Sequence, residues 1–78
     1  MKEQILEILS GLKEDVDFTT STAYITDGLL TSLDIILLIG ELSETFAVTV
    51  PAGSIIPENF NSAEAIRRLV ERLLEEQA

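Results

Sequence analysis

The chain has 78 residues, with 14 acidic against five basic side chains and a net charge of −9. This charge disfavours nucleic acids and anionic membrane surfaces as partners, because both attract positive charge. Cys and His are both absent, which excludes disulfides and removes the usual zinc ligands. We therefore expect a single domain over residues 1–78, a partner with a basic surface, no metal site and no membrane insertion.

Apolar residues at helical spacing predict a first helix over about residues 2–13. Residues 14–31 sustain no helical period, and the polar run at residues 19–22 is typical of a loop. A loop of this length is uncommon in a small domain unless it is functional or anchored. We expect apolar side chains to anchor it on the helices: Phe18, Tyr24, Ile25, Leu29 and Leu30.

A second helix is predicted from Ser32 to about Phe46, and both of its faces are rich in apolar residues. One arc should face the core: Ile35, Leu38, Ile39, Leu42 and Phe46. The opposite arc would be polar in an ordinary surface helix, but here it is mostly apolar: Leu33, Ile36, Leu37, Gly40 and Glu44. Either the long loop covers this outer arc or a partner docks on it.

Residues 47–57 are predicted to form a connecting loop with at most one helical turn, around residues 54–56, because Pro51, Gly53 and Pro57 interrupt any regular element. A last helix should follow, with Asn61 as its N-cap and Glu64 completing a capping box. The chain is thus predicted to be all-α, a small three- to four-helix bundle with a long loop between its first two helices.

The stretch around Ser32 is the candidate functional site. A turn at Gly28 leads to the Thr31-Ser32 pair at the start of the second helix, where unpaired N–H groups and the helix dipole favour an anion. We hypothesise that Ser32 carries a phosphate-linked prosthetic group. The alternative is that the Thr31-Ser32 pair only caps the helix, with Thr31 and Asp34 forming a near capping box. Independent catalysis is not expected, because no His can activate the serine and no Cys can act as nucleophile.

In these residues the chain resembles the acyl carrier and peptidyl carrier proteins, including the small stand-alone D-alanyl carriers. The family signature is Gly-x-x-Asp-Ser-Leu before an apolar helix, and here it reads Gly28-Leu29-Leu30-Thr31-Ser32-Leu33-Asp34. The helix then ends in an acidic patch, a Phe and a Val-x-Val-Pro segment, here spanning residues 41–51. The resemblance extends over essentially the whole chain and implies an acyl-carrier type of bundle.

The resemblance implies that Ser32 bears 4′-phosphopantetheine, attached by a phosphopantetheinyl transferase. The thiol of this arm would hold an acyl or aminoacyl group as a thioester, supplied by an activating ligase and passed to an acyltransferase. It further implies a cytoplasmic, monomeric carrier without catalytic residues. The surface expected to dock these partners comprises Leu33, Asp34, Ile36, Leu37, Gly40, Glu41 and Glu44.

Three positions depart from the family pattern. Thr31 stands where the usual Asp precedes the serine, Leu37 where fatty-acid carriers often have an acid, and Gly40 where they often have Met. Leu37 and Gly40 make the outer arc more apolar than in a typical fatty-acid carrier, which favours an aminoacyl or specialised acyl cargo, whereas Thr31 implies a less efficient or a different transferase. An alternative hypothesis is that the chain is a non-catalytic helical module that dimerises through Leu33, Ile36 and Leu37.

Overall fold

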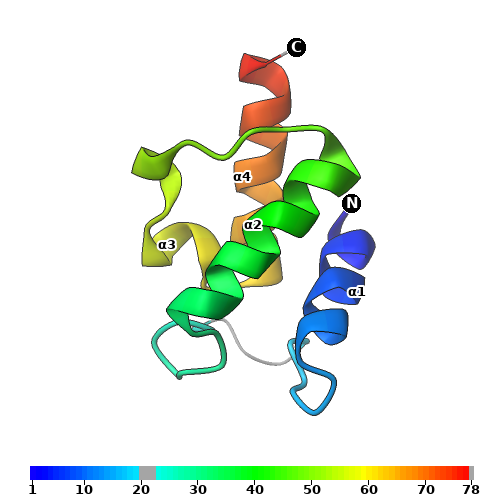
Figure 1. Ribbon diagram of the computed structural model, residues 1–78, viewed down its shortest axis with the longest axis vertical. Coiled ribbons are helices and arrows are strands. Elements are labelled where there is room, and N and C mark those ends of the chain that lie inside the picture. The colour runs from blue at the N-terminus through cyan, green and yellow to red at the C-terminus, as the bar shows by residue number, and fades with distance from the viewer. Residues whose placement is uncertain (20–22, 78) are drawn as a thin grey trace.

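The computed structural model describes residues 1–19 and 23–77 and shows, within them, a helical bundle without strands. Its elements in chain order are α1 (Lys2–Leu12), α2 (Ser32–Phe46), the single 3₁₀ turn η1 (Ala52–Ser54), α3 (Pro57–Phe60) and α4 (Ala63–Glu76). Helix α2 crosses in front of α4 in Figure 1, with α1 on one side and the short α3 on the other. The predicted all-α bundle with a long first loop is confirmed.

One hydrophobic core joins the helices and the loop. The inner arc of α2 packs there as its spacing predicts, with Ile35, Leu38 and Leu42 buried and Ile39 and Phe46 partly so. The other fully or nearly buried side chains are Ile5, Leu9, Phe18, Tyr24, Leu30, Val48, Phe60, Ala63, Ile66, Leu69, Val70 and Leu73. Among the described residues no buried side-chain polar atom lacks a hydrogen-bond partner.

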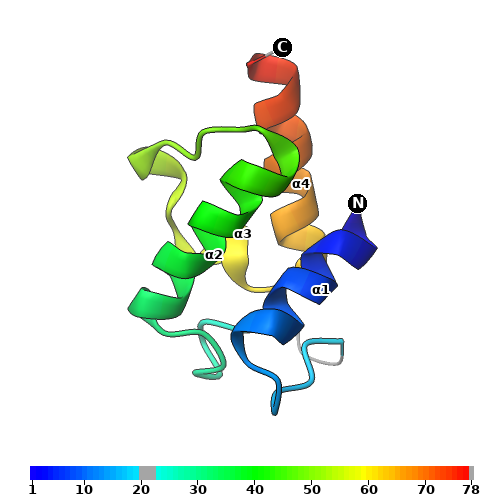
Figure 2. The same ribbon diagram turned by 45° about the vertical axis from the view of Figure 1, so that its right-hand side comes forward.

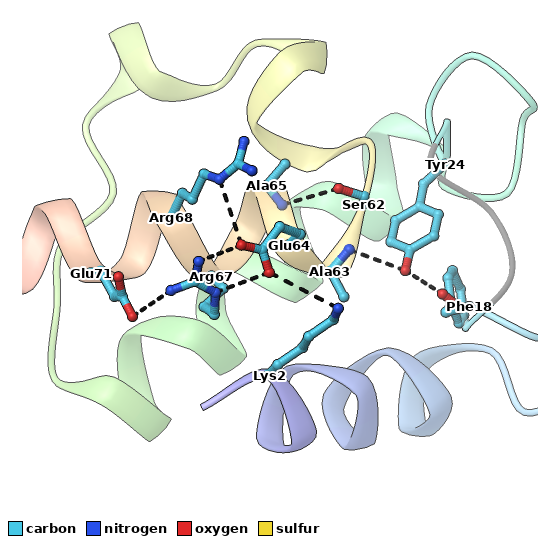
Figure 3. Close-up of polar contacts among 10 residues, drawn as sticks. All are labelled: Lys2, Phe18, Tyr24, Ser62, Ala63, Glu64, Ala65, Arg67, Arg68 and Glu71. Atoms are coloured by element: carbon cyan, nitrogen blue, oxygen red, sulfur yellow. Dashed lines mark hydrogen bonds and ion pairs between the residues drawn. The ribbon is translucent and has the colours of Figure 1, made fainter.

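Tyr24 anchors the long loop, as predicted. Its ring packs edge-on against Phe18, with ring centroids 5.1 Å apart. Its buried hydroxyl donates to the Phe18 carbonyl and accepts from the Ala63 N–H at the start of α4 (Figure 3). Leu30 is buried, and Ile25 and Leu29 pack partly against the core. Part of the polar run, residues 20–22, lies outside the described residues.

The predicted cap of the last helix is wrong by one residue. Ser62 is the N-cap of α4, and its hydroxyl accepts the Ala65 N–H at 3.0 Å (Figure 3). Asn61 instead ties the long loop to the helices: its carbonyl accepts the Tyr24 N–H at 2.8 Å, and its side-chain oxygen accepts the Ile25 N–H at 2.9 Å. The Asn61 side chain, which the local sequence pattern predicts to cap α4, is thus used for a tertiary contact with the long loop.

The segment after α2 also differs from the prediction. Its helical turn lies at Ala52–Ser54, before the expected residues 54–56, and Pro57 opens the additional short helix α3. Pro is favourable at the first position of a helix, because its missing N–H would be unpaired there anyway. Phe60 at the end of α3 is buried, so this turn is held by the core.

Candidate functional site

Ser32 is the first residue of α2 and is exposed, but it is not the helix cap. Thr31 is the N-cap: its hydroxyl accepts the Asp34 N–H at 3.3 Å, and the Asp34 carboxylate accepts the Thr31 N–H at 2.9 Å. This is a complete capping box. The Ser32 side chain makes no hydrogen bond within the described part of the chain. The predicted capping box of Thr31 and Asp34 is therefore confirmed, whereas Ser32 itself is not the cap and its hydroxyl is left available.

The turn before Ser32 is built on Tyr24 and Gly28. The Tyr24 carbonyl accepts the N–H groups of both Leu29 and Leu30, at 2.8 and 3.1 Å. Gly28 has a φ of +76°, a left-handed conformation that costs glycine little and that side chains disfavour. The same tyrosine that anchors the loop to α4 thus closes the turn that leads into α2.

A charged contact crosses from α1 to this site. Lys13 Nζ lies 3.0 Å from Asp34 Oδ2, the oxygen that also accepts from the Thr31 N–H and hydroxyl, each at 2.9 Å. The hydrogen bond from the Thr31 N–H, aided by Lys13, lowers the pKa of Asp34 below its usual value. Only 13% of the Asp34 side chain is exposed. Its carboxylate is therefore held by Thr31 and Lys13, and only a small part of the Asp34 side chain can contribute to the predicted docking surface.

The outer arc of α2 is open to solvent. Leu33 and Ile36 are each 65% exposed and Leu37 is 50% exposed, while Gly40, Glu41 and Glu44 are exposed beside them. The described part of the long loop does not cover these side chains, so the first of the two explanations for an apolar outer arc is wrong. We refer to Leu33, Ile36, Leu37 and Gly40, with Glu41 and Glu44 at their rim, as the outer face of α2.

Ser32 also borders an apolar groove of about 370 Å³ between α2 and the segment that carries η1 and α3. The groove is lined by Ile25, Ser32, Ile35, Ile36, Ile39, Ile55, Ile56, Pro57 and Phe60. Its volume falls in the range of small-molecule sites. The serine hydroxyl is the only side-chain polar group among these residues, so the groove suits an apolar occupant.

Sequence reasoning missed three contributors to this site. Ile55 and Ile56 are 45% and 41% exposed and form the wall of the groove facing α2. An apolar pair in a segment with no helical period was the available signal for them. Lys13 was not expected at this site, although it is the one basic residue between positions 3 and 66. That isolation among acids was the signal for a specific ion pair.

Comparison with known proteins identifies the family. No model of a protein family matches the chain. A curated protein of Bradyrhizobium diazoefficiens, named aminoacyl carrier protein 1, is 32% identical over 73 residues, which cover 90% of this chain and 81% of that protein. No described helix is long and apolar enough to cross a membrane. Together with the four-helix bundle and an exposed serine at the start of α2, this similarity shows that the chain belongs to the acyl/peptidyl carrier protein family.

Proposed function

We propose that the protein carries an acyl or aminoacyl group as a thioester on a 4′-phosphopantetheine arm attached to Ser32. The observation that carries this proposal is the separation of two roles at the start of α2. Thr31 and Asp34 cap the helix between them, while the adjacent Ser32 hydroxyl is exposed and unengaged in the described structure. A modified serine needs such a hydroxyl, and the cap keeps the helix intact around it.

The surroundings of Ser32 suit a phosphodiester. The first N–H groups of a helix point outward without intrahelical partners, and the dipole adds partial positive charge there. In the transfer, Ser32 Oγ forms a bond to phosphorus and loses its proton to a base on the transferase. The diphosphate bond of coenzyme A breaks, and adenosine 3′,5′-bisphosphate leaves. The arm, once bound, supplies the thiol chemistry, and the carrier itself supplies no catalytic residue.

The groove beside Ser32 offers a resting place for apolar parts of the arm or its cargo. Its isoleucine-rich lining can shelter hydrocarbon but offers a charged amino group no carboxylate. The relative is named an aminoacyl carrier protein. We propose an aminoacyl or specialised acyl cargo, with a charged amino group, where there is one, remaining in solvent.

The partners in this proposal are a phosphopantetheinyl transferase, an activating ligase and an accepting acyltransferase, all meeting a monomeric carrier in the cytoplasm. We propose that they dock on the outer face of α2. The exposed leucine and isoleucine side chains would supply apolar contact, and Glu41 and Glu44 would steer a basic surface toward it.

A second candidate function rests on the same exposed side chains. Leu33, Ile36 and Leu37 could bury each other in a dimer, which would make the chain a helical interaction module. Light scattering, which gives the oligomeric state, and the mass gain on incubation with a transferase and coenzyme A together separate the two functions. A dimer that no transferase loads favours the module, and a loaded monomer favours the carrier.

Replacing Ser32 by Ala tests the attachment site. Incubation with a phosphopantetheinyl transferase and coenzyme A should add one arm to the wild type, seen as a mass gain, and none to Ser32→Ala. Because Thr31 is the cap, the variant should lose only about 0.5 kcal/mol of stability or less. Ser10→Ala, at an exposed position of α1, is the matched control and should load normally. An arm on Ser32→Ala would place the site elsewhere.

A further inference from the structure

Lys13 makes a contact that the carrier role described so far does not use. It follows the last residue of α1, and its N–H is held by the Leu9 carbonyl at 3.0 Å. Its Nζ reaches across to Asp34 Oδ2, also at 3.0 Å. The end of α1 and the start of α2 both lie at the lower end of the bundle in Figures 1 and 2. The ion pair therefore spans the two helices beside Ser32.

Three donors converge on one oxygen of Asp34. They are the Thr31 N–H, the Thr31 hydroxyl and the Lys13 ammonium, at 2.9, 2.9 and 3.0 Å. The two side chains are mostly covered, with 29% of Lys13 and 13% of Asp34 exposed. Partial burial strengthens such a contact relative to an ion pair in open solvent. The ion pair from Lys13, at the end of α1, thus stabilises the capping box of α2.

No other cation can replace Lys13 at this position. The remaining basic residues are Lys2, Arg67, Arg68 and Arg72. In the described structure Lys2, Arg67 and Arg68 pair with Glu64 or Glu71 of α4 (Figure 3), and Arg72 lies on α4 as well. Without Lys13, the Asp34 carboxylate would keep its negative charge two residues from Ser32, in a chain of net charge −9. A phosphodiester formed on Ser32 would then meet an unbalanced carboxylate in the same helical turn.

We propose that Lys13 is a positioning residue for the modification of Ser32, holding Asp34 in the capping box and balancing its charge. This inference rests on the proposed function. Lys13 forms and breaks no bond in the transfer. It fixes the first turn of α2, so that the Ser32 hydroxyl is presented in one orientation and the incoming phosphate is not repelled.

Loading kinetics of two Lys13 variants test the proposal. Lys13→Met should lower kcat/KM for arm loading by about fivefold, the size that a partly exposed ion pair supports. Lys13→Arg should restore loading, because a guanidinium can reach the same carboxylate. Lys2→Met is the matched control, since it removes the same charge from α1 at a pair with Glu64, on the α4 side of the helix. It should load like the wild type.

Amide hydrogen exchange gives a readout that does not depend on the transferase. In Lys13→Met, exchange should quicken at Thr31, Asp34 and Ile35, whose N–H groups bond within the cap and first turn of α2, and stay unchanged in the core of α4. Wild-type kinetics in Lys13→Met, or equal slowing in Lys2→Met, would overturn the positioning role while leaving the carrier function intact. A wild type that no transferase loads would instead overturn the carrier function, and the role of Lys13 with it.

Discussion

Three residues around the start of α2 have different roles. Thr31 caps the helix, Ser32 presents a hydroxyl, and Asp34 links the cap to Lys13. The family pattern has Asp where Thr31 stands, and Asp and Thr are both effective N-caps. Thr31 therefore keeps the capping function that the usual Asp can also perform, while removing one negative charge next to the modified serine.

Asp34→Asn should make the protein less stable in a pH-dependent way. The pKa of Asp34 is lowered in the folded state, so its contribution is fully present above the unfolded value of 3.8 and is lost as pH falls through the folded value. We expect a loss of about 1 kcal/mol at pH 7, since a hydrogen-bonded charge is removed. The difference between the variant and the wild type should shrink below about pH 4, near that unfolded value.

Urea unfolding at pH 7, 5 and 3 measures this difference. Glu44→Gln is the control, because this exposed acid of the same helix makes no hydrogen bond or ion pair within the described structure. A destabilisation by Asp34→Asn that is equally large at pH 3 would show that the carboxylate charge is not what stabilises the cap.

At the scale of the element, α2 has two apolar faces that differ in their exposure to solvent. One face is buried in the core, and the other is at least half exposed at Leu33, Ile36 and Leu37. The helix ends at Phe46, and the next residue, Ala47, has a φ of +55°, the left-handed conformation that often follows a helix and that glycine usually adopts. Because the residues of the outer face of α2 do not pack in the core, their identity can be set by binding to a partner and not by stability.

Leu37→Glu tests the docking proposal. The variant should stay folded, with a loss of about 0.5 kcal/mol from repulsion by Glu41 one turn away. It should nevertheless weaken transfer to or from the cognate partner, because apolar contact area is lost and a charge must be desolvated. The measurement is partner kcat/KM beside thermal unfolding.

Thr45→Glu supplies the matched control for this prediction. It adds the same charge one turn from Glu41, at an exposed position of α2 that borders α1. Equal loss of transfer in both variants would point to net charge and not to the outer face of α2. Normal transfer in Leu37→Glu would remove Leu37 from the docking surface.

At the scale of the whole molecule, the charges are unevenly distributed. Four of the five basic residues lie on α4 or at the start of α1, and Lys13 alone serves the end that carries Ser32. The ion pairs between described residues engage only Asp34, Glu64 and Glu71 on the acidic side. Most acidic residues therefore add to a negative electrostatic field that attracts basic partners but destabilises the folded protein through self-repulsion.

Added salt should raise the melting temperature, because screening weakens this self-repulsion. A gain of 1 kcal/mol corresponds to about 4–8 °C in a domain of this size. A variant with Glu75→Lys and Glu76→Lys, at exposed positions near the C-terminus, should respond less because its net charge is smaller. A wild-type melting temperature indifferent to ionic strength would show that the charges are better balanced than the ion pairs suggest.

The sequence by itself determined the features that depend on local spacing. Helical periodicity predicted α1, α2 and the core face of α2, and the motif around Ser32 predicted the family. Only the tertiary structure decided where side chains with several options would bond. Asn61 holds the loop although its sequence position suits a cap, Lys13 reaches Asp34 from another helix, and Ile55 and Ile56 wall a groove beside Ser32. These contacts join segments distant in the chain, and no local pattern specifies them, because each depends on how the helices pack.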